Sequence, residues 1–378
     1  MISETGMSMP EVNRENFDRQ KLEEIYFSLQ KIKRDLYPLF CKLSDNPESV
    51  DFDSDALLEE FAKEPAFDTV NYTYLRDKSS VSNFFNHDIA TFGVSLAAAI
   101  SLLDYGMKDD IVIKTVVSRF PAYVSVLEDV LTRSLEKDSD FVAEKKPLDF
   151  DFFDKSLVSL IADGESCRGR VRYLITKQFF GADNADSFSL DKLKDFLTSE
   201  LNFKKFLESD EEIITNQGNL TNSIFNIIRN ACKKDFKANN VNFIVSREDD
   251  QMVIRVCDDG VGMAANQLNE ASENFIFLHG AKSSTEEHTI DRTFDGRTVD
   301  IHGLGISALP QRLKKNANGD VFVWSRKKDE ADKPYSVFPN DCQREIPIKS
   351  IPIVADQGQQ SLVSTVFEIR LPITKKAA

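Results

Sequence analysis

Cysteine is scarce in this sequence, and its few copies lack the spacing of a metal site. The five cysteines are scattered along the chain and are nowhere arranged as C-x-x-C. They are Cys41, Cys167, Cys232, Cys257 and Cys342. An odd and scattered set argues against a disulfide framework and against a zinc site, and it favours a reducing compartment.

Long hydrophobic runs are also absent, and so is a secretory signal. The longest apolar stretch, residues 92–103, contains a glycine and two serines and covers about a dozen residues, whereas a membrane helix needs ~20. The chain begins MISETGMSMPEV, without a basic start and a following apolar segment. We therefore predict no signal peptide, no membrane association and a cytoplasmic location.

Basic residues are outnumbered by acidic ones. The chain has 62 Asp and Glu against 47 Lys and Arg, which gives a formal net charge of −15. A surface of this sign repels a phosphate backbone, so the composition argues against nucleic-acid binding. The other proportions, 41% hydrophobic and 29% charged residues, are those of a globular protein. A length of 378 residues is enough for two or three domains.

The first half of the chain has the periodicity of long helices. Residues 14–44 carry apolar side chains every three or four positions, which predicts either a packed helix or a coiled-coil arm. Residues 74–104 and 111–137 follow the same period with a short connection, which predicts an antiparallel hairpin. Because one hairpin leaves an apolar face uncovered, we expect two copies to form a four-helix homodimer.

From about residue 211 the pattern changes to mixed helices and strands. A predicted helix at 219–236 is followed by β-like runs at 241–248 and 252–259, a helix from 303 to about 316, and strands at 320–326 and 364–373. Helices mixed with antiparallel-type strands predict an α+β sandwich. The expected organisation is a helical and connector region at 1–73, an all-α hairpin at 74–137, an inserted region of unknown role at 138–210, and an α+β domain at 211–378.

Two segments of the α+β domain have the polar residues and glycines of a nucleotide site. Asn226 and Asn230 lie four residues apart on one helical face, with Lys233 almost one turn further, so that amide and ammonium groups can hold magnesium and phosphates. In CDDGVGM, directly after a strand, the Asp258 carboxylate can accept a hydrogen bond from an exocyclic amine. The glycines at 260 and 262 (Gly260 and Gly262) let the backbone approach a flat base.

A third segment, HGLGIS at 302–307, opens a helix. Gly303 and Gly305 leave backbone N–H groups at the helix N-terminus, where a phosphate is favoured. Taken singly, each of the three segments also fits surface polarity, a turn or a plain helix cap. Their order along the chain favours a nucleotide site.

In this order the segments resemble the N, G1 and G2 boxes of the ATP-binding fold that histidine kinases share with gyrase, mismatch-repair and chaperone ATPases, the GHKL fold. The resemblance covers residues 211–378 and includes the closing strand TVFEIRLP. It implies that ATP and Mg²⁺ are bound, with Asn230 as the magnesium ligand and Asp258 on the adenine. Asn226 and Lys233 would support the phosphates.

The resemblance also implies a nucleotide lid at residues 264–302, with Phe275 and Phe277 in the region of the F box. Two departures from the family pattern are visible. Ile301 stands where the G2 box usually has its first glycine, and a long segment at 327–362 extends the loop before the last strand.

One position separates family members that hydrolyse ATP from those that transfer its phosphoryl group. The hydrolysing members have a Glu one turn before the N-box Asn, where it activates water as a general base. That position is Asn226 in this chain, and an amide cannot take the proton. Transfer to a side chain is therefore favoured over hydrolysis.

The expected acceptor is one of only four histidines. His87 lies in NHDIATF, which resembles the H-D-x-x-T phosphoacceptor motif of histidine kinases, with Phe92 where the family usually has Pro. Asp88 would hold or take a proton from one imidazole nitrogen and so raise the nucleophilicity of the other. Thr91, one helical turn from His87, would position a water for dephosphorylating a partner.

These features predict a cytoplasmic histidine kinase that phosphorylates His87 from ATP. The phosphoryl group would then pass to an aspartate on a response-regulator receiver domain, with phosphatase activity as an additional option. Two alternatives stay open. One is a non-catalytic phosphotransfer or scaffold protein with a degenerate ATP domain, and the other is a GHKL-type Ser/Thr protein kinase in which His87 is structural.

Overall fold

The protein forms two compact units, Met1–Ala143 and Glu144–Ala378, in a computed structural model. The structure describes residues 11–45, 64–65, 111–136, 143–163, 203–232, 238, 241–278, 293–294, 297–298, 306, 309–330, 332–342, 344 and 363–376. No helix within these residues is long and apolar enough to cross a membrane.

Two long helices make up most of the described part of the first unit. Helix α1 covers Glu11–Asp45 and helix α5 covers Ile111–Glu136, which confirms the helices predicted at 14–44 and 111–137. Residues 74–104, the other arm of the predicted hairpin, lie outside the described residues. The hairpin and its dimer therefore stay predictions.

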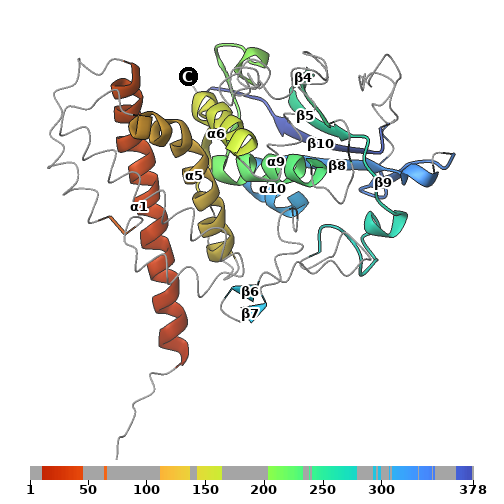
Figure 1. Ribbon diagram of the computed structural model, residues 1–378, viewed down its shortest axis with the longest axis horizontal. Coiled ribbons are helices and arrows are strands. Elements are labelled where there is room, and N and C mark those ends of the chain that lie inside the picture. Colours follow the sequence, from red (N-terminus) through yellow and green to blue (C-terminus); the bar gives the residue numbers. More distant parts are fainter. Residues whose placement is uncertain are drawn as a thin grey trace, which may run out of the picture. The chain divides into compact units, whose positions relative to one another are not determined.

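Helices α1 and α5 lie side by side and run in opposite directions (Figure 1). The ring of Tyr37 stacks on that of Phe120, with centroids 5.6 Å apart. Gln30 Nε2 donates a hydrogen bond of 3.0 Å to the carboxylate of Glu128. The apolar stripe expected on α1 is buried at Leu22, Ile25, Leu29, Ile32 and Leu36. The stripe was expected to mark either a packed helix or a coiled-coil arm, and in the structure α1 is a helix packed against α5.

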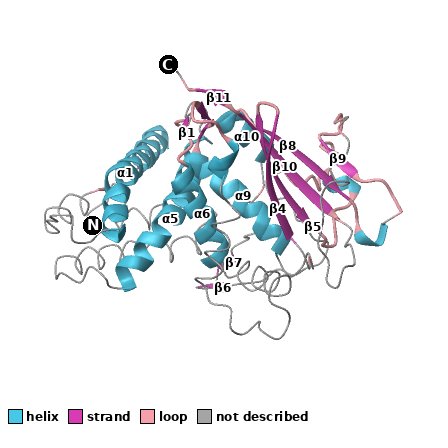
Figure 2. Cartoon of the chain, turned by 90° about the horizontal axis from the view of Figure 1, so that it is seen from above, coloured by secondary structure: helices cyan, strands magenta, loops and turns pink. Residues whose placement is uncertain are grey.

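The described residues of the second unit form two main layers, a five-stranded sheet and three α-helices (Figure 2). The sheet has the strand order β4-β5-β10-β8-β9, and every neighbouring pair is antiparallel. The strands are β4 (Val241–Glu248), β5 (Gln251–Asp258), β8 (Asp320–Ser325), β9 (Ser336–Phe338) and β10 (Thr365–Pro372). Helices α6 (Phe150–Asp163), α9 (Gln217–Cys232) and α10 (Leu309–Ala317) lie on one face of the sheet. The predicted α+β sandwich is confirmed.

Short elements complete the described chain. Six two-residue strands form small antiparallel pairs: β1 (Lys146–Pro147) with β3 (Ile214–Thr215), β2 (Glu211–Glu212) with β11 (Thr374–Lys375), and β6 (Thr293–Phe294) with β7 (Arg297–Thr298). Three 3₁₀ helices are η4 (Phe203–Phe206), η6 (Ala265–Gln267) and η7 (Lys328–Glu330).

The core between the layers follows from the two side-chain periods. Alternate residues of β10, Phe367, Ile369 and Leu371, are buried against the helices, as the period of two requires. Residues of α9 at spacings of three and four (Leu220, Ile224, Ile227 and Ala231) are buried as well. The helices and the sheet thus share one apolar layer.

The described parts of the region expected as an insertion, 138–210, belong to this core. Phe153 and Leu157 of α6 and Phe203 of η4 are fully buried in it. The backbone N–H of Leu148 donates a hydrogen bond of 2.8 Å to the carbonyl of Ile213, next to the β1–β3 pair. These parts therefore extend the α+β layer rather than form a separate body.

The opposite face of the sheet carries buried charges. Arg255 on β5 and Glu368 on β10 are direct cross-strand neighbours, and Arg255 Nε donates to Glu368 Oε2 at 2.6 Å. Arg370 Nε donates to the other oxygen, Oε1, at 2.5 Å. Glu368 is 1% exposed. A third guanidinium, that of Arg344, lies 3.5 Å from Oε1 through its Nη1. A carboxylate this deeply buried depends on such cationic partners.

Candidate nucleotide-binding site

Asp258, the last residue of β5, is the best-defined polar group of the site. It is 7% exposed, and its Oδ1 accepts hydrogen bonds from Gly260 N–H at 2.9 Å and from Ser364 Oγ at 3.1 Å. Burial raises the pKa of this carboxyl to about 6, against the lowering effect of the two hydrogen bonds. The group is therefore ionised at neutral pH. Within the described residues, Oδ2 has no protein partner and can accept from a ligand.

The loop after Asp258 is shaped by one glycine. Gly262 has a φ of +71°, in the left-handed region that favours glycine. A Cβ atom at this position would lie 2.0 Å from the carbonyl oxygen of Arg326. The loop is thus in contact with the backbone that leaves β8, and no larger residue fits there.

Hydrogen bonds from the end of β8 and from β10 fix the same loop. Met263 N–H donates to Ser325 Oγ at 2.9 Å, and this hydroxyl lies 2.9 Å from Thr365 Oγ1. The backbone N–H of Ser364 donates to the carbonyl of Asp258 at 2.8 Å. The hydroxyls of Ser325 and Thr365 and the backbone of Ser364 therefore support the predicted G1 segment.

Helix α9 positions the two asparagines of the predicted N box. Asn216 caps its start, since Asn216 Oδ1 accepts from the backbone N–H of Asn219 at 3.0 Å. Asn226 is buried, and its Nδ2 donates to the carbonyl of Asn222 at 2.8 Å. Asn230, one turn further, is half-buried. With one N–H engaged, the Asn226 amide retains a neutral carbonyl oxygen and one further N–H, and neither group can act as a base.

The F-box phenylalanines belong to the core. Phe275 and Phe277 are 6% and 3% exposed, and their ring centroids are 5.4 Å apart. The backbone N–H of Ile276, between them, donates to the carbonyl of Gln267 at 2.9 Å. The first part of the predicted lid, residues 264–278, is therefore folded onto the domain.

Several predicted site residues lie outside the described residues. They are Lys233, Gly303 and Gly305 of the nucleotide site and His87, Asp88 and Thr91 of the acceptor motif. The structure thus brings Asp258, Gly260 and Gly262 together in one loop and places Asn226 and Asn230 on one helix. It does not test the other six.

Ser364 is a site residue that the motifs did not reveal. It lies directly before β10, where the neighbouring Thr365 pairs with Asp258. Its hydroxyl donates both to the carboxylate and to the carbonyl of Asp258, each at 3.1 Å. The antiparallel pairing of the closing strand with the strand that ends at the aspartate is the signal that identifies it.

Comparison with known protein families identifies the domain. Residues 215–374 match the family described as histidine kinase-, DNA gyrase B-, and HSP90-like ATPase. The predicted GHKL-type ATP-binding domain is confirmed for this span, which is less than half of the chain. Helix α6 and η4 pack into the same core but precede the matched residues. No curated protein matches the chain significantly.

Proposed function

We propose that this chain, whose residues 215–374 form a GHKL-type ATP-binding domain, is a histidine kinase that phosphorylates His87. The observation that carries the proposal is the state of Asn226. Its amide occupies the position of the hydrolytic Glu, is buried, and donates to the carbonyl of Asn222 at 2.8 Å. An amide in this arrangement has no capacity to deprotonate a water, so bound ATP is preserved for transfer to a protein side chain.

The described residues fit the two ends of ATP. At the base end, Oδ2 of Asp258 accepts from the exocyclic amine, while Gly262 brings the backbone close. At the phosphate end, Asn226 and Asn230 lie four residues apart on α9 and would offer amide oxygens, and Lys233, outside the described residues, is the proposed cation. Bound Mg²⁺ would be held by Asn230 and the phosphates and would neutralise phosphate charge. The protein contributes orientation and charge, as in other phosphoryl transfers.

The transfer itself would use the motif at 87–91. Nε2 of His87 attacks the γ-phosphorus and the bond to the bridging oxygen breaks, so that ADP leaves. Asp88 stabilises the proton on the other ring nitrogen. The phosphoryl group then passes to an aspartate of a response-regulator receiver domain. Thr91 would orient water for the reverse, phosphatase reaction, and the hairpin at 74–137 would join two copies in a homodimer.

Replacing His87→Ala tests the acceptor. We expect wild-type protein incubated with γ-³²P-labelled ATP to gain acid-labile label, and the variant to gain none while it binds MgATP with unchanged affinity. A chase with a purified receiver domain should remove the label from the wild type.

The other outcomes separate the alternatives. Acid-stable label that persists in His87→Ala would identify a Ser/Thr protein kinase. A wild type that binds MgATP but gains no label would identify a scaffold or phosphotransfer protein, because a degenerate ATP domain then serves only as a binding module.

Replacing Gly262→Ala tests the G1 loop. Because φ is +71° and the added Cβ would overlap the carbonyl of Arg326, the loop must move. We expect the free energy of unfolding to fall by about 2 kcal/mol and the MgATP affinity to fall roughly tenfold. The neighbouring Val261→Ala, at a 37% exposed side chain, should change the stability by less than about 0.5 kcal/mol. Wild-type affinity in Gly262→Ala would contradict this assignment. Calorimetric titration measures the affinity for MgATP.

A further inference from the structure

We propose that the segment after β8, residues 326–342, positions both walls of the ATP site and that Phe338 is the residue through which it fixes the base of the nucleotide lid. Residues 327–342 of this segment belong to the extension that departs from the family pattern, and Arg326 directly precedes it. The inference depends on ATP binding by the domain and is independent of which side chain is phosphorylated.

The first wall is the G1 loop. The backbone N–H of Lys328 donates to the carbonyl of Val261 at 3.0 Å, and its Nζ donates to the carbonyl of Asp259 at 3.2 Å. The carbonyl of Arg326 lies against Gly262, where a Cβ would be 2.0 Å away. Three of the four loop residues from 259 to 262, all except Gly260, are thus in contact with the start of the post-β8 segment.

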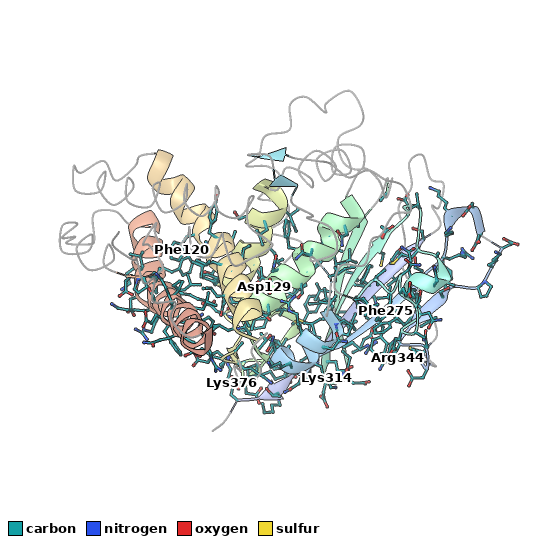
Figure 3. All side chains as sticks on the ribbon, turned by 90° about the horizontal axis from the view of Figure 1, so that it is seen from below. Phe120, Asp129, Phe275, Lys314, Arg344 and Lys376 are labelled. Atoms are coloured by element: carbon teal, nitrogen blue, oxygen red, sulfur yellow. The ribbon has the colours of Figure 1, made fainter. Side chains whose placement is uncertain are left out.

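The second wall is the base of the lid. Phe338 lies on β9, pairs with Val323 of β8 and is 6% exposed. Its ring centroid is 5.4 Å from that of Phe275 and 4.9 Å from that of Phe277. Phe275 lies beside the strands of the sheet (Figure 3). The F-box rings are therefore held against an edge strand that the post-β8 segment itself supplies.

The rings of Phe275, Phe277 and Phe338 form an aromatic cluster at the base of the lid, and this position explains why the cluster would affect ATP binding. Leu278, the last described residue of the lid base, is 43% exposed, whereas the rings immediately before it are buried. The cluster therefore fixes the described end of the lid base at residues 275–277. A lid base fixed in advance loses less conformational entropy when a nucleotide binds. Removing the Phe338 ring releases that base without touching any group that contacts ATP.

The decisive comparison is Phe338→Ala against Phe203→Ala. Phe203 is also buried in the same core and also has two ring partners, Phe153 at 4.9 Å and Phe243 at 5.9 Å, but these come from α6 and β4. We expect both variants to unfold at a lower temperature. Only Phe338→Ala should raise the Kd for MgATP, by about tenfold, measured well below its unfolding temperature.

Hydrogen–deuterium exchange provides the second readout. In Phe338→Ala, amides of residues 264–278 should exchange faster than in the wild type and should regain protection with saturating MgATP. In Phe203→Ala the same amides should be unchanged. If Phe338→Ala does not fold, Phe338→Leu and Phe203→Leu replace the pair, since leucine keeps apolar volume but removes the ring contacts. The expected rise in Kd for Phe338→Leu is then about threefold.

Two outcomes would overturn the proposal. One is an equal change of Kd in the Phe338 and Phe203 variants, which would assign Phe338 a general role in the core. The other is an unchanged Kd and unchanged exchange at 264–278 in Phe338→Ala. Because the measurement is direct binding of MgATP, a failure of His87 to accept phosphate would leave both readouts intact.

Discussion

Asp258→Asn is expected to lower the affinity for MgATP about a hundredfold without lowering the stability of the domain. Oδ1 of Asp258 accepts from Gly260 N–H and Ser364 Oγ, so an asparagine keeps its carbonyl oxygen on that side. Its NH₂ group then replaces Oδ2. A donor would face the exocyclic amine of adenine, which is also a donor, and the charge-assisted bond would be lost. Calorimetric titration with MgATP measures this change.

The stability of the same variant supplies the control. Since the folded pKa of Asp258 is raised to about 6, the native state binds more protons than the unfolded state between about pH 4 and 6. The contribution of Asp258 is fully present below its unfolded pKa and is lost as the pH rises through about 6. Asparagine does not titrate, so the ligand-free variant should gain stability relative to the wild type over this range, by up to about 3 kcal/mol.

Thermal unfolding of both proteins at pH 4, 5, 6 and 7 measures the difference. The comparison is needed because burial also raises the pKa of Asp154, to about 7. The titration of Asp154 changes the stability of both proteins with pH in the same direction. A variant that loses stability at pH 7 together with ATP binding would mean that Asp258 is structural. A variant that binds MgATP normally would remove it from the site.

The parts of the fold that sequence predicts well are those with local signals. The helical periods of α1, α5 and α9 and the β-like runs of β4, β5 and β10 are visible within each segment, and their bounds agree with the structure to a few residues. Strand β9 has no such signal. It is three residues long, lies between Pro334 and Pro339, and exists because it pairs with β8.

The residues of the site can be separated in the same way, into those that a local pattern predicts and those that it does not. Asp258 and Gly262 are predictable because the G1 motif is contiguous and its chemistry depends on residue type. Ser364 donates to Asp258 from 106 residues further along the chain, and Phe338 packs on the F box from a segment whose residues suggest only a loop. Such contacts follow from strand order, which no local pattern determines. The membership of α6 in the core depends on such contacts as well, since the helix packs on α9 and η4.

Glu368→Ala is expected to lower the free energy of unfolding of the second unit by about 3–5 kcal/mol. Glu368 is 1% exposed and receives hydrogen bonds from Arg255 Nε at 2.6 Å and Arg370 Nε at 2.5 Å. Both guanidiniums also donate to Glu248, whose side chain is 36% exposed. Without Glu368, two nearly buried cations would share one half-exposed carboxylate, and their desolvation would no longer be offset.

A matched control and a compensating variant separate lost charge pairing from lost packing. Glu330→Ala removes a carboxylate from an exposed pair with Lys333 and should cost less than about 1 kcal/mol. In the triple variant Arg255→Met, Glu368→Leu and Arg370→Met, the buried charges are replaced by apolar side chains of similar volume. If unpaired charge is the cause, this variant should recover most of the stability lost in Glu368→Ala in chemical denaturation, because apolar packing replaces buried ion pairs at little cost. If it unfolds as readily as Glu368→Ala, the loss comes from the shape of the glutamate and not from its charge.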